Sequence, residues 1–135
     1  MGFEIRKIGV IGAGQMGKGI AHVCALAGYD VALNDISQER IDAGVADIAA
    51  QMRRAAERGQ LDASNIEPAL ERISSAPEIA GLADSDLVIE AATEVEDVKR
   101  KILAELAKVA KTDAIISSNT SSISITRLAS VTGRP

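Results

Sequence analysis

Aromatic residues are almost absent from this 135-residue chain, which holds Phe3, Tyr29 and no tryptophan. Its core must therefore be built from small and branched aliphatic side chains, which suit a parallel sheet covered on both faces. The lack of aromatic rings also removes the stacking platforms on which single-stranded nucleic acids bind. The formal net charge is -4, with acidic and basic residues interleaved, so the sequence has no electrostatic footprint for nucleic acid.

Cysteine and histidine occur once each, as Cys24 and His22. A single cysteine excludes an intrachain disulfide and a cysteine-based metal cluster, so no metal site is predicted. We expect Cys24 to be a buried, unreactive thiol on the apolar side of a helix, and His22 to face solvent on the opposite side. A catalytic base is therefore not expected at His22. The predicted apolar side of this helix comprises Met16, Ile20, Val23, Cys24 and Ala27.

Long apolar runs are also missing. None approaches the roughly 18 residues that suggest a membrane span, and the N-terminus carries Glu4 with no apolar segment typical of a secretory signal. Hydrophobic residues make up 47% of the chain and charged residues 25%, as is typical of globular domains. We expect one domain in the cytoplasm, without a membrane or nucleic acid partner.

Glycine, in contrast, is concentrated between Lys7 and Gly19. An apolar run leads into Gly12, Gly14 and Gly17, and a helical pattern follows, which predicts a strand, a tight turn and a helix. In a dinucleotide site the first glycine makes the turn, the second lets the backbone approach a pyrophosphate, and the third lets the helix pack close to its strand. The pyrophosphate lies where unpaired N–H groups and the positive end of the helix dipole point.

An acidic residue supports this interpretation. A second predicted strand, Val31–Asn34, ends at Asp35, a little over 20 residues after Gly12, which is the separation at which a carboxylate meets the adenosine ribose. Such a carboxylate accepts hydrogen bonds from both ribose hydroxyls and repels a 2′-phosphate, so we predict NAD rather than NADP. Gln15 and Met16, within the glycine loop, are predicted cofactor contacts. In the alternative interpretation Asp35 is only a turn residue that caps the next helix.

The remaining periodicity predicts an alternation of strands and helices. This alternation indicates an α/β fold with an open, mostly parallel, doubly wound sheet of the Rossmann type. A helical hairpin is expected between the second and third strands. The predicted strands are 8–11, 31–34, 73–75, 87–91 and 114–117, and the predicted helices are 15–27, 38–58, 64–71, 94–109 and 124–130.

The expected hairpin is far longer than a minimal parallel crossover, and its polar side carries three arginines. Two interpretations of Arg53, Arg54 and Arg58 remain open. They form a solvated helix face balanced by Asp47 and Glu57, or they bind the anionic tail of a ligand.

Ligands of doubly wound sheets bind outside the carboxyl ends of the strands, where the strand order reverses. Four polar or glycine-rich segments fall at such ends: Gly12–Gly17, Asp35, Ala92–Glu94 and Ser118–Ser121. We expect them to converge on one edge. The chain stops at Gly133–Pro135, residues that begin a loop, so an excised domain is expected.

Several motifs together resemble the NAD-binding domain of the 3-hydroxyacyl-CoA dehydrogenases, which include the bacterial 3-hydroxybutyryl-CoA dehydrogenases. They are Gly-Ala-Gly-Gln-Met-Gly at 12–17, Asp35, Glu90-Ala-Ala-Thr-Glu94 followed by Lys99, and Ser118-Asn-Thr-Ser-Ser122. The last is the most specific, and the resemblance covers nearly the whole chain. Members of this family oxidise the 3-hydroxyl of an acyl-CoA to a ketone and pass the hydride to NAD, or run the reverse reaction.

The resemblance also implies roles for individual residues. Glu94 and Lys99 match family positions on the nicotinamide side of the cofactor. Ser121 matches the serine that hydrogen-bonds the substrate oxygen, where a hydroxyl stabilises developing oxyanion charge, and Asn119 lies beside it; both are candidate catalytic residues. On spacing alone, Ser121 as a helix cap and a Glu94–Lys99 surface pair remain alternatives.

The resemblance further implies what residues 1–135 lack. The general base of the family is a histidine, oriented by a glutamate, shortly beyond the point where this chain ends, and His22 does not match it. The helical C-terminal domain, through which the family dimerises and closes over acyl-CoA, is also outside this chain. We therefore expect NAD binding without turnover, and a homo-oligomeric parent protein. Arg53 and Arg54 become candidates for contact with acyl-CoA.

Two other functions remain open. The broader β-hydroxyacid dehydrogenases share a glycine turn followed by Met-Gly but use a catalytic lysine on a later helix; Asp35 and the serine-rich loop favour the first family. The second is a non-catalytic NAD-binding or structural module, because a fold does not fix an activity.

Overall fold

The computed structural model describes residues 5–92, 95–111 and 114–118, and all structural statements below refer to them. The strands are β1 (Lys7–Ile11), β2 (Asp30–Asn34), β3 (Ile73–Ser75), β4 (Leu87–Glu90) and β5 (Ile115–Ser118). The helices are α1 (Gln15–Leu26), α2 (Gln38–Glu57), α3 (Ile66–Glu71) and α4 (Glu96–Val109), with short 3₁₀ turns η1 (Ala63–Asn65) and η2 (Ile79–Leu82).

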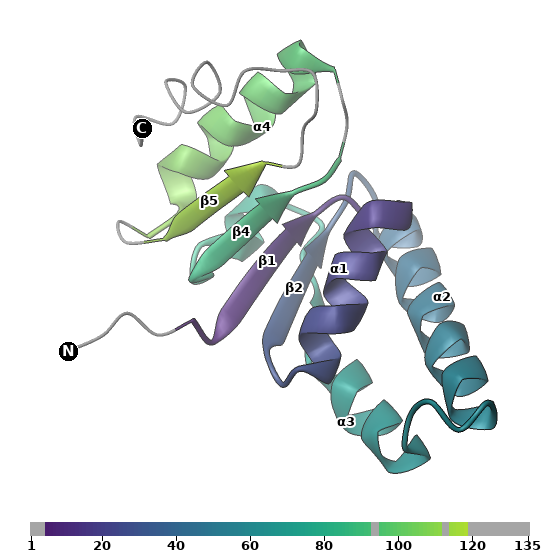
Figure 1. Cartoon of the computed structure of the whole chain (residues 1–135). Helices are drawn as coiled ribbons and strands as arrows, with labels where there is room; N and C mark the ends of the chain where they lie inside the picture. The colour runs from purple at the N-terminus through teal and green to yellow at the C-terminus, as the bar shows by residue number, and fades with distance from the viewer. Residues whose placement is uncertain (1–4, 93–94, 112–113, 119–135) are drawn as a thin grey trace.

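The described strands form one parallel sheet in the order β3-β2-β1-β4-β5. The chain moves outward from β1 to β3 and then returns to β4 on the other side of β1, so the strand order reverses beside β1. Ile11 stands opposite both Asn34 and Glu90, and Glu90 stands opposite Ser118. Four strands therefore end at the same level (Figure 1), and the predicted doubly wound α/β sheet is confirmed.

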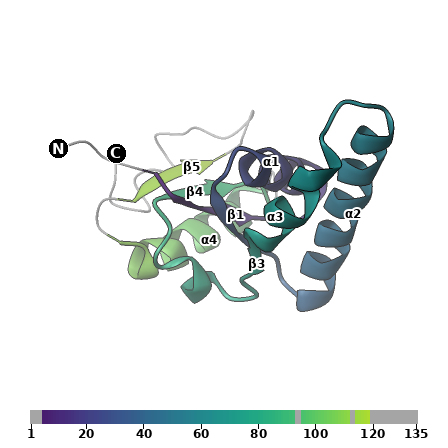
Figure 2. The ribbon, with the colours of Figure 1, turned by 90° about the horizontal axis from the view of Figure 1, so that it is seen from below.

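Helices cover both faces of the sheet, and Figure 2 shows α1 and α4 on opposite sides of the strands. Alternate strand residues point to opposite faces: Ile8 and Val10 join the cluster under α1, α2 and α3, whereas Ile11 joins the one under α4 and η2. Both clusters are aliphatic apart from Met52, as the scarcity of aromatic residues predicted.

The first helix, α1, packs through its smallest side chains. Gly17, Ala21 and Ala25 are buried at a spacing of four residues, while Met16 and Val23 are 56% and 68% exposed. The predicted apolar side of this helix was therefore wrong for Met16 and Val23, whereas Ile20 and Cys24 are partly buried and pack against the cluster as expected. The physical reason is the close approach of α1 to the sheet, which leaves room only for glycine and alanine at its innermost positions.

The two single-copy side chains on α1 are each half-buried. Burial raises the pKa of the Cys24 thiol, which agrees with the predicted unreactive cysteine. Burial also lowers the pKa of His22, an effect opposed by a hydrogen bond with Gln51 of α2. His22 therefore lies against α2 and is not fully exposed to solvent, contrary to the prediction.

The connection from β2 to β3 contains α2 and α3, which contact each other. The Ser37 hydroxyl caps α2 by accepting a hydrogen bond from the Arg40 N–H, and Glu39 adds a favourable negative charge in the first turn. Just beyond α2, Gly59 adopts a φ of 73° that favours glycine. None of the described helices combines the length and apolar character needed to cross a membrane.

The amino-terminal end of the sheet is held by one buried carboxylate, Asp86. Its Oδ2 accepts hydrogen bonds from the N–H groups of Arg6 (2.8 Å) and Lys7 (3.0 Å), and its Oδ1 pairs with the Lys111 ammonium. The hydrogen bond with Lys111 and those from the two backbone amides hold the pKa of Asp86 well below its usual range. This side chain thus ties the start of β1 to the loops before β4 and β5.

We predict that Asp86→Asn lowers the free energy of unfolding by about 1–3 kcal/mol at pH 7, because two partly buried backbone amides and an ammonium lose a charged acceptor. A depressed carboxyl pKa contributes stability above the unfolded value near pH 4, and this contribution is lost as pH falls through the native pKa. The difference between wild type and variant should therefore narrow below about pH 4. Urea unfolding at pH 7 and pH 3 measures it.

Asp84→Asn is the matched control, since its exposed pair with Lys7 should contribute little. Equal unfolding midpoints for Asp86→Asn and Asp84→Asn at pH 7 would contradict the structural role of Asp86.

Candidate functional site

The turn after β1 and the start of α1 require glycine at two positions for reasons internal to the fold. Gly12 has a φ of 106°, and a Cβ added to it would lie 2.8 Å from the Ala92 Cα. A Cβ added to Gly17 would lie 1.6 Å from the Gly12 carbonyl oxygen. The glycine turn is therefore pressed between α1 and the segment after β4.

Gly14 is different, because the packing of the protein does not explain it. Its backbone is extended, with φ -72° and ψ -171°, which any residue adopts. A Cβ added there would meet nothing within 4 Å. No side chain caps α1 at this end, and its first turn holds no acidic residue. An anion over Gly14 would therefore meet the positive end of the helix dipole.

Asp35 lies beside this turn at the end of β2, and its side chain is only 11% exposed. Its Oδ2 accepts a hydrogen bond from the Ala13 N–H (2.8 Å) and its Oδ1 one from the Ile36 N–H (2.6 Å). The Arg40 guanidinium lies 3.9 Å from the same Oδ1. Since Ser37 caps α2, the interpretation of Asp35 as the helix cap is not supported. A carboxylate has about four acceptor sites, so sites remain for hydroxyl donors.

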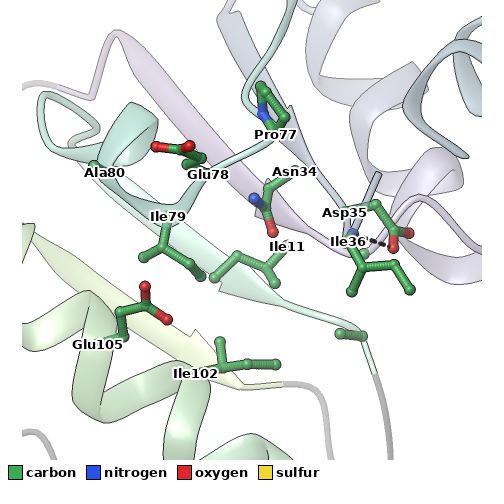
Figure 3. Close-up of a pocket in the computed structure, with 12 residues that line it drawn as sticks. Ile11, Asn34, Asp35, Ile36, Pro77, Glu78, Ile79, Ala80, Ile102 and Glu105 are labelled. Carbon is green, nitrogen blue, oxygen red and sulfur yellow. Dashed lines mark hydrogen bonds between the residues drawn. The ribbon is translucent and has the colours of Figure 1, made fainter. Parts of the chain in front are cut away.

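A cavity of about 380 Å³ opens at this edge of the sheet (Figure 3). Asp35 and Ile36 lie at one side and Ile79, Ile102 and Glu105 at the other, with Ile11 between them. The remaining lining residues are Gly12, Asn34, Pro77, Glu78, Ala80 and Ala92. The lining is mostly apolar but includes three carboxylates, of Asp35, Glu78 and Glu105, and the one at Asp35 adjoins the glycine turn. Such a cavity suits a flat heterocycle attached to a sugar.

Sequence reasoning missed most of this cavity. Pro77, Ile79 and Ile102 carry no motif, and they meet only because η2 and α4 pack on the same face of the sheet. The signal that could have located them is indirect: they follow β3 and β4, whose carboxyl ends were expected at the binding edge.

A buried ion pair lies next to the glycine turn. The Lys99 ammonium is 2.5 Å from Glu90 Oε1, and both side chains are fully buried. Glu90 Oε2 accepts a hydrogen bond from the Ala92 N–H at 2.7 Å. The interpretation of Lys99 as half of an exposed surface pair is therefore wrong, because the start of α4 packs its side chain inward. Sequence reasoning gave Glu90 no role.

Of the other predicted site residues, Gln15 and Met16 are exposed at the start of α1. The rest divide into two groups. Arg53 and Arg54 are exposed near the C-terminal end of α2, about 24 Å from Ser37 at 1.5 Å per residue. Helix α2 runs from the carboxyl edge toward the other end of the sheet (Figure 1), so they lie far from the glycine turn. Glu94, Asn119 and Ser121 lie outside the described residues. Within the described part of the chain, no group of three His, Cys, Asp or Glu could hold a metal ion.

Comparison with known proteins assigns the family. Residues 7–135 match the family model described as 3-hydroxyacyl-CoA dehydrogenase, NAD binding domain. The chain therefore belongs to the 3-hydroxyacyl-CoA dehydrogenase family. Its cofactor is NAD, and the resemblance inferred from the sequence is confirmed. These residues fit NAD. The space over Gly14 is open, and the cavity beside Asp35 has a mostly apolar lining.

Relatives agree with this assignment. The chain is 54% identical over 135 residues to a 3-hydroxybutyryl-CoA dehydrogenase of Bradyrhizobium diazoefficiens, of which it covers 46%. It is 41% identical over 135 residues to the 3-hydroxyadipyl-CoA dehydrogenase of Escherichia coli, of which it covers 28%. The crystal structure of an (S)-3-hydroxybutyryl-CoA dehydrogenase from Ralstonia eutropha superimposes with a TM-score of 0.92 at 44% identity, covering 95% of this chain and 45% of that one. The chain thus spans less than half the length of each of these three relatives.

We predict that Gly14→Ser weakens NADH binding by about 5- to 100-fold, because the added side chain fills the open space over the helix N-terminus (about 1–3 kcal/mol of steric cost). The fold should not suffer, since serine is among the best N-cap residues. Fluorescence titration with NADH and thermal unfolding measure the two effects.

Gly19→Ala is the control. Gly19 is exposed within α1 and an added Cβ meets nothing within 4 Å, so this substitution should raise helix stability and leave NADH affinity unchanged. Wild-type affinity in Gly14→Ser would show that the pyrophosphate does not lie over Gly14.

Proposed function

We propose that this chain is the cofactor-binding part of an enzyme that transfers hydride between NAD(H) and the 3-hydroxy or 3-keto group of a short-chain acyl-CoA. The observation that carries the proposal is the open space over Gly14, which has no role in packing and adjoins Asp35 and the apolar cavity. The relatives named as 3-hydroxybutyryl-CoA dehydrogenases support the substrate class.

Each part of the cofactor has a proposed location. The pyrophosphate lies over Gly12, Gly14 and Gly17, with Gln15 and Met16 exposed beside it. The ribose hydroxyls donate hydrogen bonds to Asp35, and the adenine enters the 380 Å³ cavity. When bound, NAD supplies the carbon that accepts or donates the hydride; the residues of this chain hold and orient it.

The reacting end involves residues of the two following strand ends. We place Lys99 and Glu94 on the nicotinamide side, and Ser121 and Asn119 beside the substrate oxygen. Two positions support this placement: Lys99 meets the end of β4, and β5 ends at Ser118, directly opposite Glu90. A serine hydroxyl at that edge would donate to the oxygen that becomes negative during hydride transfer.

Turnover requires a proton acceptor that residues 1–135 do not provide. His22 is the only histidine, and it lies about 12 Å along α1 from Gly14 and is bonded to Gln51. We propose that the base, the cover over acyl-CoA and the interface of a homo-oligomer belong to the part that relatives carry and this chain does not cover. A cytoplasmic location also belongs to this proposal.

Asp35→Asn tests the cofactor assignment in the 135-residue chain. We expect NADH affinity to fall about 10-fold, because the ribose hydroxyls lose a charged acceptor. The preference for NADH over NADPH should also become smaller, because the Asp35 carboxylate no longer repels the 2′-phosphate of NADPH. Calorimetry with NADH and NADPH in turn measures both.

Asp42→Asn makes the same charge change on an exposed face of α2, where the Asp42 carboxylate accepts a hydrogen bond from Gln38. This control should leave the preference for NADH over NADPH unchanged. A preference in Asp35→Asn identical to wild type would remove Asp35 from ribose recognition.

The substrate assignment is tested in a chimaera in which this chain replaces the matched half of the Bradyrhizobium relative. The chimaera should oxidise NADH with acetoacetyl-CoA. Charge reversal, Arg53→Glu with Arg54→Glu, should raise the KM for acyl-CoA several-fold with little change in the KM for NADH, because both side chains lie far from the glycine turn.

Lys101→Glu with Lys108→Glu provides the same charge change on exposed positions of α4 and should leave the acyl-CoA KM unchanged. Equal effects of the two double substitutions would argue against a CoA contact at Arg53 and Arg54. A chimaera that binds NADH without oxidising it would favour the non-catalytic alternative.

A further inference from the structure

The Glu90–Lys99 pair is the most deeply buried charge pair in the described part of the chain. Both side chains are 0% exposed, and their charged atoms are 2.5 Å apart. The other described ion pairs all retain exposure on at least one partner. Removing two charges from water costs so much that an apolar pair of similar volume is usually as stable. Stability alone therefore gives no physical reason for charges at this point.

The position of the pair suggests a different reason. Glu90 is the last residue of β4, in register with Ile11 at the end of β1. Lys99 reaches it from α4, so one carboxylate joins the strand end to the helix that follows it. Glu90 and Lys99 thus flank Ala92 in the sequence, and Ala92 lines the cavity at the cofactor edge.

The second carboxylate oxygen extends the arrangement to the glycine turn. Glu90 Oε2 accepts the Ala92 N–H, and Ala92 lines the 380 Å³ cavity. Ala92 also lies so close to Gly12 that an added Cβ there would be 2.8 Å from its Cα. A continuous line of contacts therefore runs from Lys99 through Glu90 and Ala92 to Gly12.

We propose that Glu90 is a positioning residue of the cofactor site. It holds the Lys99 ammonium and the Ala92 amide in place, and so sets the local charge and the position of the Ala92 backbone beside Gly12 for the nicotinamide half of NAD. This inference rests on the proposed function, which places Lys99 on that side of the cofactor. Glu90 itself need not touch NAD.

A purely structural role and a role in positioning the cofactor site predict different results in a double-substitution cycle. Glu90→Gln removes the carboxylate that pairs with a buried ammonium, and Lys99→Met removes the ammonium that pairs with a buried carboxylate, so each should lower the Tm by about 10 °C or more. The combination, Glu90→Gln with Lys99→Met, keeps the side-chain volumes without charge, and its Tm should return close to that of wild type.

In the combined variant NADH affinity should stay below that of wild type even though the Tm recovers. In the 135-residue chain, each single variant and the combination should bind NADH at least about 10-fold more weakly than wild type, with non-additive losses because the pair acts as one unit. Titration by NADH fluorescence, well below each Tm, gives these values. The control is Lys7→Met with Asp84→Asn, which removes an exposed pair at the amino end of the sheet and should leave NADH affinity unchanged.

The outcomes separate the inference from the proposed function. If wild type does not bind NADH, the proposed function fails. If wild type binds and the charge-free combination binds equally well, Glu90 and Lys99 are structural only and the inference is overturned. Wild-type affinity in a folded Glu90→Gln would overturn it as well.

A measurement on the wild-type chain covers the case in which the variants do not fold. NMR of the labelled chain should show large shifts of the Ala92 amide and the Lys99 side chain as NADH saturates the site. The Lys7 amide, bonded to Asp86 at the other end of the sheet, should not move. If the chemical shifts of Ala92 and Lys99 do not change when NADH saturates the site, the proposal is overturned.

Discussion

The close approach of α1 to the end of β1 is the constraint on which the rest of the binding edge depends. It exists because Gly17 places no side chain against the Gly12 carbonyl, where even a Cβ would overlap. This contact directs the N-terminus of α1 at the gap beside β2 and leaves the space over Gly14 open. It also explains why the fully buried positions of α1 are limited to Gly17, Ala21 and Ala25.

Asp35 connects this turn to the second strand. By accepting the Ala13 amide, its carboxylate is held in position before any ligand arrives, with few rotamers left to lose on binding. The same charge that orients the ribose also fixes the glycine turn. Structure and recognition are therefore coupled at this residue, whereas at Gly14 they are separate.

Sequence motifs predicted the structural features that are formed by residues close together in the sequence. The glycine turn follows from a short motif whose residues interact within one βαβ unit, and the doubly wound sheet follows from the alternation of strands and helices. The family follows from several short motifs along the chain. Side-chain burial on α1 was mispredicted, because apolar periodicity ignores how closely a particular helix can approach its sheet. For Lys99 the sequence left a surface pair with Glu94 open as an alternative, since nothing near it in sequence identifies Glu90 as a buried partner nine residues away. The cavity side chains Ile79 and Ile102 were missed because only tertiary packing brings them together.

The two ends of the sheet differ in what their charged groups do. At the amino end, Asp86 accepts two backbone amides and the Lys111 ammonium, and Lys7 pairs with Asp84, so the charges there are used within the chain. At the carboxyl end, Asp35 and the helix terminus over Gly14 keep capacity for another molecule. Substitutions along the same strands can therefore alter ligand preference at one end while the folding energy held at the other is conserved. At Gly14 recognition can therefore change without a change in stability, and at Asp86 stability can change without a change in recognition, although only about five residues of each strand separate the two ends.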